Sequence, residues 1–313
     1  MSAADPTTEM RATTEQPVER RVVANGAELC LFEWPGVGPP ILLVHATSFH
    51  GRTWDVVARR LPGRCVLAVD MRGHGRSERS EGPYTWRRFG DDVVDLVRVL
   101  DLRDVVGVGH SMGGHSVTYA AAEAPGRFAA LLLVDPVIVR RPPPADRPGA
   151  EGMAASDFVA RRRNEWTSRE EMIERFRDRF PHSLWQAEVL EDYAQYGLLP
   201  APGAEGYVLA CPPAVEAEIY RRSHEFDIYG HVARVPAPVR ILRARPAGDG
   251  DQSAFVASPT DPELASAFPR AEDVVLPELT HFIPMQAPDL VASHIRDLVD
   301  RPAEGSPGGS RMA

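Results

Sequence analysis

The sequence predicts an α/β protein: a mostly parallel, twisted sheet of about eight strands with helices on both faces, plus a helical insertion. Short apolar runs rich in Val, Ile and Leu alternate with stretches of helical spacing, as in sheets buried on both faces. Between about Arg140 and Val235 the alternation stops, and the chain becomes strongly charged and helical. The 313 residues suffice for one large core with such an insert.

The two ends of the chain are expected to be disordered. Residues 1–18 are mostly Ala, Thr, Glu and Pro, and residues 301–313 have low complexity, so neither stretch has much to bury. The core is then predicted over residues 19–137 and 237–300, and the helical insert over residues 138–236.

The first elements form one edge of the predicted sheet and the strands next to it. Asn25-Gly26 tolerates the positive φ angles of a tight turn and separates two apolar runs, which predicts an antiparallel hairpin at the edge. Strands and helices are then predicted, in chain order, over residues 41–44, 54–61, 65–69 and 91–100.

The stretch from Asp104 to Glu123 organises the rest of the chain. A β-branched apolar run is followed at once by helical spacing, and Gly109-His110-Ser111-Met112-Gly113 lies between them. Its outer glycines remove Cβ atoms that would collide in so sharp a strand-to-helix turn. A Gly/Ser cluster is often a simple turn, but a strand before it and a helix after it favour a nucleophile elbow. Ser111 would then lie where helix N–H groups stabilise an oxyanion.

The second half of the chain completes the sheet. A strand over residues 129–134 ends at Asp135, and after the insert the remaining elements are predicted over residues 238–242, 261–268, 273–276 and 289–300. The insert carries an apolar helical side whose aromatic residues pack on the core and can also line a cleft. Those expected to contact substrate are Trp166, Phe176, Trp185, Tyr193 and Tyr196.

Composition argues against several classes of partner. The net charge of −9 at pH 7 disfavours nucleic acid and anionic membranes, and acidic residues close after Arg161-Arg162-Arg163 indicate a solvated helix face. Cys30, Cys65 and Cys211 are far apart without metal-binding spacing, which indicates reduced thiols.

The N-terminus lacks the basic region and apolar core of a signal peptide, and no apolar run approaches membrane-spanning length. We therefore expect a cytoplasmic protein that acts on a small molecule, without metal, cofactor, nucleic-acid or membrane partner. The sequence predicts no particular oligomeric state.

A serine hydroxyl needs a base to take its proton, and the base needs a partner to hold its tautomer. His281 lies in the loop after the last predicted strand, so a parallel sheet would bring it to the same edge as Ser111. Other histidines near strand ends are interpreted as structural; these are His45, His50, His74, His110 and His115.

From about Glu19 to Asp300 the chain resembles the α/β-hydrolase superfamily. The matching segments are the loop at His45, the D-x-R-G-H-G-x-S segment at Asp70 to Ser77, the elbow G-H-S-M-G-G, and T-H-F-I-P with His281. Relatives usually have His-Gly where this chain has His45-Ala46, a change that affects the width of the loop but keeps its N–H.

The resemblance implies roles for several residues. Ser111 would be the nucleophile, His281 the base, and the backbone N–H groups of Met112 and Thr47 the oxyanion hole. Residues 138–236 would form a helical cap over the site.

The resemblance leaves two places for the triad acid. Relatives carry it after the penultimate strand, where this chain has R-A-R-P-A-G-D-G-D with Asp249 and Asp251, or directly after the strand before the cap, where Asp135 lies. We prefer Asp249 over Asp135.

The function expected is that of a serine hydrolase. It would cleave a small to medium, mostly apolar ester, lactone, thioester or activated amide through an acyl-enzyme on Ser111. The alternatives are a carbon–carbon bond hydrolase or a cofactor-free lyase or peroxidase-like enzyme on the same triad. A non-catalytic ligand-binding homologue is a third class, which the Ser111 and His281 pair disfavours.

Overall fold

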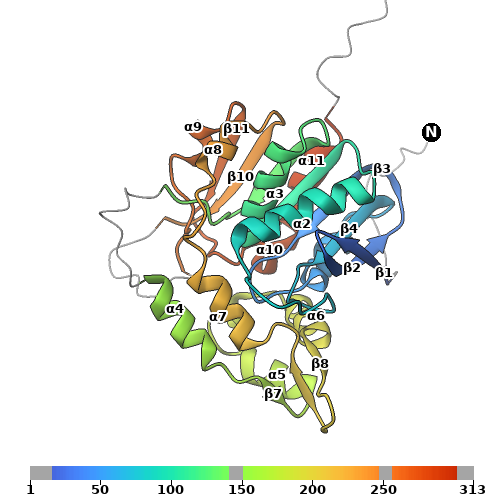
Figure 1. The fold of residues 1–313 in the computed structure, drawn as a ribbon, viewed down its shortest axis with the longest axis vertical. Helices are drawn as coiled ribbons and strands as arrows, with labels where there is room; N and C mark the ends of the chain where they lie inside the picture. Colours follow the sequence, from blue (N-terminus) through green and yellow to red (C-terminus); the bar gives the residue numbers. More distant parts are fainter. Residues whose placement is uncertain (1–15, 141–150, 247–255, 302–313) are drawn as a thin grey trace, which may run out of the picture.

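The computed structural model describes residues 16–140, 151–246 and 256–301. Its main sheet has eight strands, in the order β1 (Val18–Ala24), β2 (Ala27–Trp34), β4 (Arg64–Asp70), β3 (Val37–Val44), β5 (Val105–His110), β6 (Phe128–Val134), β10 (Val239–Ala244) and β11 (Ala271–Leu276). β1 pairs with β2 and β2 with β4 in antiparallel fashion, and the other pairings in this sheet are parallel (Figure 1). The predicted mostly parallel sheet and its antiparallel edge are confirmed.

The centre of the sheet is its most apolar part. Every residue of β5 is buried, and β3 is buried from Ile41 to Val44. Strands covered on both faces need no alternation of polar and apolar residues, which is why these runs could be found in the sequence. The edge strand β1 buries only Val22 and Ala24.

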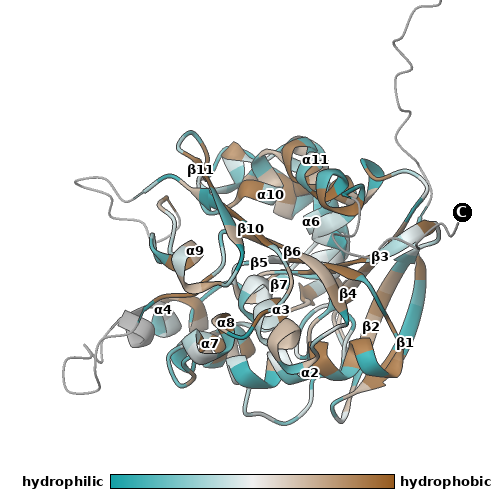
Figure 2. Cartoon of the chain, turned by 90° about the horizontal axis from the view of Figure 1, so that it is seen from above, coloured by the Kyte–Doolittle hydropathy of each residue, from teal (hydrophilic) through white to brown (hydrophobic). Residues whose placement is uncertain are grey.

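Helices cover both faces of the sheet. One face packs against α2 (Trp86–Val99), α3 (Met112–Glu123), α8 (Tyr229–Val232) and α9 (Leu264–Ala267), and the other against α1 (Asp55–Arg59), α10 (Ile283–Gln286) and α11 (Pro288–Val299). Figure 2 shows the strands between α11 on one side and α2 and α3 on the other. α9 is shorter than the helix predicted over residues 261–268.

The chain between β6 and β10 forms a smaller body, which we call the insert (residues 151–235). Its helices and strands are α4 (Glu151–Ala160), β7 (Glu165–Trp166), α5 (Arg169–Phe176), the 3₁₀ helix η3 (His182–Leu184), α6 (Ala187–Gly197), β8 (Leu198–Pro200), β9 (Tyr207–Leu209), α7 (Pro213–Arg221) and the α8 already named. In Figure 1 most of it lies below the main sheet.

The insert is not purely helical. Three short strands form an antiparallel sheet in the order β7-β9-β8. They are too short to show a period of two in the sequence, so periodicity could not predict them. α8 also falls within the predicted insert of residues 138–236, yet Val232 packs in the core with α2 and α3.

The ends of the chain are described only in part. β1 already begins at Val18, and the rest of the predicted disorder in residues 1–18 and 301–313 falls almost entirely outside the described residues. Among the helices of the described ranges, none has the length and apolarity needed to cross a membrane.

Candidate active site

Ser111 lies at a sharp turn between β5 and α3. Its φ of 56° and ψ of −117° place it in a region that non-glycine residues rarely adopt. A Cβ atom on Gly109 would lie 2.3 Å from the carbonyl oxygen of Gly113, and one on Gly113 would lie 2.1 Å from that of Val44. Both glycines are therefore required for the close approach of strand and helix, as the sequence indicated.

Ser111, His281 and Asp135 form one chain of polar contacts. Nε2 of His281 lies 3.1 Å from Oγ of Ser111, and Nδ1 of His281 lies 2.6 Å from Oδ2 of Asp135. The three residues are buried, with 7%, 6% and 0% of their surfaces exposed for Ser111, His281 and Asp135. A hydroxyl, an imidazole and a carboxylate in this order can move a proton off the serine.

Asp135 follows β6 directly and is held by several donors. Its Oδ1 accepts hydrogen bonds from the backbone N–H of Ala244 at 2.9 Å and from Oγ of Ser258 at 2.6 Å, with Oγ1 of Thr260 at 3.5 Å. Burial raises the pKa of Asp135, but hydrogen bonds and the interaction with His281 outweigh burial and bring the pKa below its usual value. Asp135 is thus an ionised acceptor for the Nδ1–H of His281.

The preference for Asp249 finds no support in this geometry. Asp249 and Asp251 lie outside the described residues, and both ring nitrogens of His281 already have partners in Ser111 and Asp135. The register of the sheet explains the outcome: β5 and β6 are neighbours, and His110 pairs with Val134. The residues that follow, Ser111 and Asp135, leave the sheet side by side. Recognising that these two strands are adjacent would have favoured Asp135.

Buried histidines hold the loops around this chain of contacts. Nε2 of His110 donates to the backbone carbonyl of His281 at 2.8 Å, and burial lowers the pKa of His110 to about 3, so its ring is neutral. His45 and His74 accept backbone N–H groups from the loops after β4 and β3, and burial lowers the pKa of both. These contacts agree with the structural role that the sequence indicated.

The two residues named for an oxyanion hole are in contact. Oγ1 of Thr47 donates to Sδ of Met112 at 3.4 Å. Met112 opens α3, where the first backbone N–H groups have no acceptor within the helix. The His45-Ala46 departure leaves this arrangement intact, because Nδ1 of His45 binds the carbonyl oxygen of Ala46 at 2.7 Å and orders the loop.

An aromatic cluster from the insert packs beside the Ser111 and His281 loops. Four of the residues expected to contact substrate belong to it: Trp166, Phe176, Trp185 and Tyr193. The ring of Trp185 lies 5.8 Å from that of Phe49 and 5.5 Å from that of Phe282, between centroids. Phe282 adjoins His281, and the Phe49 ring lies 6.4 Å from the His110 ring. Trp185 therefore contacts both Phe49 and Phe282, the two aromatic rings that lie beside the candidate catalytic residues.

The fifth expected residue, Tyr196, lies elsewhere. The Arg52 guanidinium lies over its ring, 3.7 Å from the centroid, and its hydroxyl donates to Gln16 at 3.1 Å. Tyr196 thus packs toward the N-terminal end of the described chain, and spacing along α6 did not reveal this direction.

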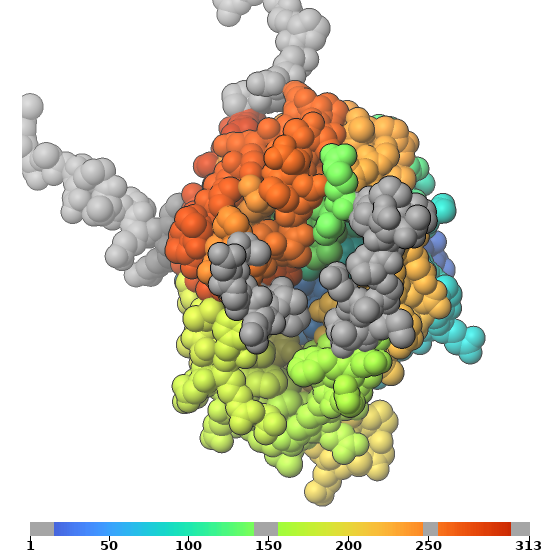
Figure 3. Space-filling model, turned by 90° about the vertical axis from the view of Figure 1, so that its left-hand side faces the viewer, coloured from blue at the N-terminus to red at the C-terminus, as the bar shows by residue number. Residues whose placement is uncertain are grey.

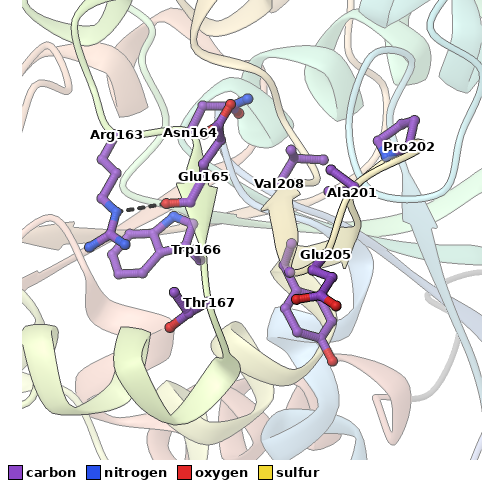
Figure 4. Close-up of a pocket in the computed structure, with 12 residues that line it drawn as sticks. Arg163, Asn164, Glu165, Trp166, Thr167, Ala201, Pro202, Glu205 and Val208 are labelled. Atoms are coloured by element: carbon purple, nitrogen blue, oxygen red, sulfur yellow. Dashed lines mark hydrogen bonds between the residues drawn. The ribbon is translucent and has the colours of Figure 1, made fainter.

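Two hollows are visible on the insert and beside it. A groove of about 900 Å³ is lined by β7, β9 and the loop from β8 to β9, and Figure 4 shows Trp166 and Arg163 on one side of it. Nε of Arg163 donates to the carbonyl oxygen of Glu165 at 2.6 Å, while its guanidinium lies 4.4 Å from the Trp166 ring centroid. Ser111 and His281 do not line this groove. The second hollow, of about 440 Å³, is lined by Val139, Arg140 and residues 259–263. In Figure 3 the insert, in yellow-green, lies below the orange C-terminal part of the core.

Metal-ligating residues do not gather in the ranges that the structure describes. No group of three or more His, Cys, Asp or Glu residues there could hold a metal ion. Cys30, Cys65 and Cys211 are free thiols.

Comparison with known proteins places the chain among alpha/beta hydrolases. The sequence profile of the alpha/beta hydrolase family matches residues 41–294. The 2-(acetamidomethylene)succinate hydrolase of Mesorhizobium japonicum is 25% identical over 272 residues, which is 85% of this chain and 89% of that protein. The crystal structure of E-2-(acetamidomethylene)succinate hydrolase has a TM-score of 0.73 at 23% identity, covering 91% of this chain and 100% of the other.

Relatives of higher identity match over shorter stretches. The non-heme chloroperoxidase CPO-A1 of Kitasatospora aureofaciens is 34% identical over 122 residues, which is 37% of this chain and 44% of that protein. The chain spans less than half the length of several such curated relatives.

Proposed function

The chain belongs to the alpha/beta hydrolase family, and from this premise we propose that it hydrolyses a small to medium, mostly apolar ester, lactone, thioester or activated amide through an acyl-enzyme on Ser111. The observation that carries the proposal is the chain of contacts from Ser111 through His281 to Asp135. The named hydrolase of Mesorhizobium japonicum supports hydrolysis in general.

In this mechanism Nε2 of His281 takes the proton of Ser111 as Oγ attacks the substrate carbonyl. Asp135, in place of the Asp249 favoured from the sequence, holds the Nδ1–H of His281 and stabilises the imidazolium. The backbone N–H groups of Met112 and Thr47 donate to the oxyanion. His281 then gives its proton to the leaving group and activates the water that releases the acyl group from Ser111.

We propose that the insert (residues 151–235), which falls within the predicted bounds of residues 138–236, forms a cap over this site. Trp166, Phe176, Trp185 and Tyr193 would form the apolar wall of the acyl pocket, because their cluster contacts the residues beside His281. Tyr196 is left out, since it packs on Arg52.

A fluorophosphonate probe tests the proposal. Mass spectrometry of the labelled, folded protein should locate the adduct on the peptide that contains Ser111, and p-nitrophenyl butyrate should be hydrolysed with a burst of one product per protein. Ser111→Ala should abolish both signals, and His281→Ala should slow labelling strongly. Labelling at another residue, or ester turnover that survives Ser111→Ala, would contradict the acyl-enzyme mechanism.

A second candidate is peroxidase-like chemistry on the same residues. The observation that favours it is the partial match to the non-heme chloroperoxidase of Kitasatospora aureofaciens. Here hydrogen peroxide would take the acyl group from Ser111 in place of water and leave as a peracid. Halide oxidation that requires a carboxylic acid, hydrogen peroxide and an intact Ser111 would support this activity, and its absence beside robust ester hydrolysis would exclude it.

A further inference from the structure

The loop that carries Thr47 is held from two sides at the next residue, Ser48. Ser48 has a φ of 69°, a left-handed conformation that persists in a non-glycine residue only where its surroundings fix it. From the core, Nε2 of His74 accepts its backbone N–H at 3.2 Å. From the insert, the Glu216 carboxylate forms a hydrogen bond with its side chain. Ser48 therefore joins the loop to the insert.

Glu216 is a buried carboxylate in the first turn of α7, with only 2% of its surface exposed. Nη1 of Arg162 donates to its Oε2 at 2.6 Å. A buried ion pair contributes little net stability, because desolvation offsets the attraction between its charges, but it fixes the relative position of its members. The pair is thus better suited to set geometry than to stabilise the fold.

Arg162 also links the insert to Phe49 and His50, the loop residues that follow Ser48. Its side chain also hydrogen-bonds that of Tyr193. The Tyr193 ring lies 5.6 Å from the Phe49 ring, and its carbonyl oxygen lies 3.3 Å from Nε2 of His50. The Arg162 guanidinium is thus linked to three consecutive residues of the loop: to Ser48 through Glu216, and to Phe49 and His50 through Tyr193.

We propose that Glu216, tied to Arg162, is a positioning residue for the oxyanion hole: it holds Ser48 in its left-handed conformation and so aims the backbone N–H of Thr47 at the acyl oxygen. The inference rests on the proposed function, because the oxyanion forms only if Ser111 attacks a carbonyl. The insert then acts on the transition state as well as on substrate binding. Removal of an oxyanion donor costs about 10²–10³ in kcat, so a misdirected Thr47 N–H should cost about 10- to 100-fold.

Three substitutions separate the contacts. Glu216→Leu removes both the Ser48 and the Arg162 contact, whereas Glu216→Gln keeps an acceptor for Ser48 without the charge. Ser48→Gly adopts a positive φ without strain but lacks the hydroxyl. We expect Glu216→Leu and Ser48→Gly to lower kcat by about 10- to 100-fold with KM changed less than about threefold, and Glu216→Gln to recover much of the loss.

The Ki of a reversible trifluoromethyl ketone distinguishes a positioning role of Glu216 from a merely structural one. It forms a tetrahedral adduct on Ser111, so its Ki should rise in step with the loss in kcat/KM, while the Ki of the product acid stays unchanged. The double variant Ser48→Gly with Glu216→Leu should be no worse than either single variant, because both remove one interaction.

The Arg59–Asp192 pair supplies a matched control. It also joins the core to the insert, from α1 to α6, with a separation of 2.8 Å. Asp192→Asn should leave kcat and the inhibitor Ki within about twofold, as expected for a partly exposed ion pair.

The outcomes distinguish this proposal from the proposed function. Equal losses in Asp192→Asn and Glu216→Leu, or a raised KM with kcat intact in Glu216→Leu, would overturn the positioning role while Ser111 labelling of the wild type still stands. A wild type without Ser111 labelling would overturn both. If circular dichroism shows Glu216→Leu unfolded, Ser48→Gly and the inhibitor series decide.

Discussion

The imidazole of His281 and the carboxylate of Asp135 are 2.6 Å apart, although 146 residues separate them in the chain. Asp135 follows β6, whose neighbours in the sheet are β5 and β10. The strand that precedes the carboxylate therefore lies directly beside the strand that precedes Ser111. The candidate triad is carried by the turns that follow the carboxyl ends of parallel strands. Its geometry therefore depends on the register of the central strands.

Asp135→Asn is expected to lower kcat by about 10⁴-fold, because an amide can hold the wrong tautomer of the base and cannot stabilise its cation. Asp249→Asn and Asp251→Asn should change kcat by less than about tenfold under the same p-nitrophenyl ester assay, since an acid that does not contact the base contributes little of this effect. A large loss confined to Asp249→Asn would return the acid role to the loop after β10.

Ser111→Ala should remove ester turnover by about 10⁴-fold or more while the fold persists, because the side chain at this turn contributes hydrogen bonding to His281 and little packing. Steady-state kinetics gives the loss, and the thermal melting curve checks the fold. Retention of more than a few per cent of the wild-type kcat would contradict the role of Ser111 as nucleophile.

Most of the sheet could be predicted because a strand buried on both faces is apolar along its whole length, whatever its neighbours. The elbow could be predicted because only glycine fits at Gly109 and Gly113. The close approach of strand and helix therefore shows in the sequence as two glycines. His281 followed from its place after the last strand and from the family resemblance.

The remaining features depend on which strands and side chains lie next to each other in space, and the sequence does not show this. In the sequence, Asp135 and Asp249 each follow a predicted strand, and only the spatial order of the strands shows that Asp135 meets His281. Tyr193 and Tyr196 lie on one helix, yet one contacts Phe49 and the other Arg52. Packing partners, rather than helical spacing, decide which of these aromatic rings belongs to the candidate pocket.

Stability is expected to fall as the pH drops below neutrality. Burial lowers the pKa of several histidines, among them His50 and His110 (to about 3), His74 (to about 4) and His45 (well below the usual range). Between about pH 6.5 and 4 the unfolded chain binds these protons and the folded chain does not, so the free energy of unfolding decreases with decreasing pH. Each such group contributes at most about 1.4 kcal/mol per pH unit.

Urea unfolding at pH 7, 6 and 5 measures this dependence. Asp55 and Asp70, whose pKa burial raises to about 6, oppose it at the acid end, because the folded state binds their protons more strongly. The comparison of wild type with His110→Asn isolates one histidine: the variant should show a shallower decrease between pH 7 and 5. Parallel curves for the two proteins would contradict the neutral state of His110.

Trp185→Ala should widen the acyl pocket and shift the preference among p-nitrophenyl esters toward longer chains, because the indole packs between Phe49 and Phe282 beside His281. We expect kcat/KM for decanoate relative to butyrate to rise by about tenfold, within the range for one or two methylene contacts. Tyr196→Ala is the control, since that ring packs on Arg52 instead, and its chain-length profile should match the wild type. An unchanged profile in Trp185→Ala would remove Trp185 from the pocket wall.

Gly113→Ala should damage both the fold and the site. The new Cβ would lie 2.1 Å from the carbonyl oxygen of Val44 and 2.7 Å from that of His45, and these backbone atoms cannot give way as a flexible side chain would. Either α3 or the end of β3 must shift, which would separate Met112 from Thr47. We expect a loss of about 1–3 kcal/mol in the free energy of unfolding, as in other overpacked sites, together with a fall in kcat. Gly230→Ala is the matched control, because a Cβ there meets nothing within 4 Å, and it should leave stability and kcat nearly unchanged. Urea unfolding and ester kinetics on both variants decide, and equal behaviour of the two would contradict the close packing of α3 on β3.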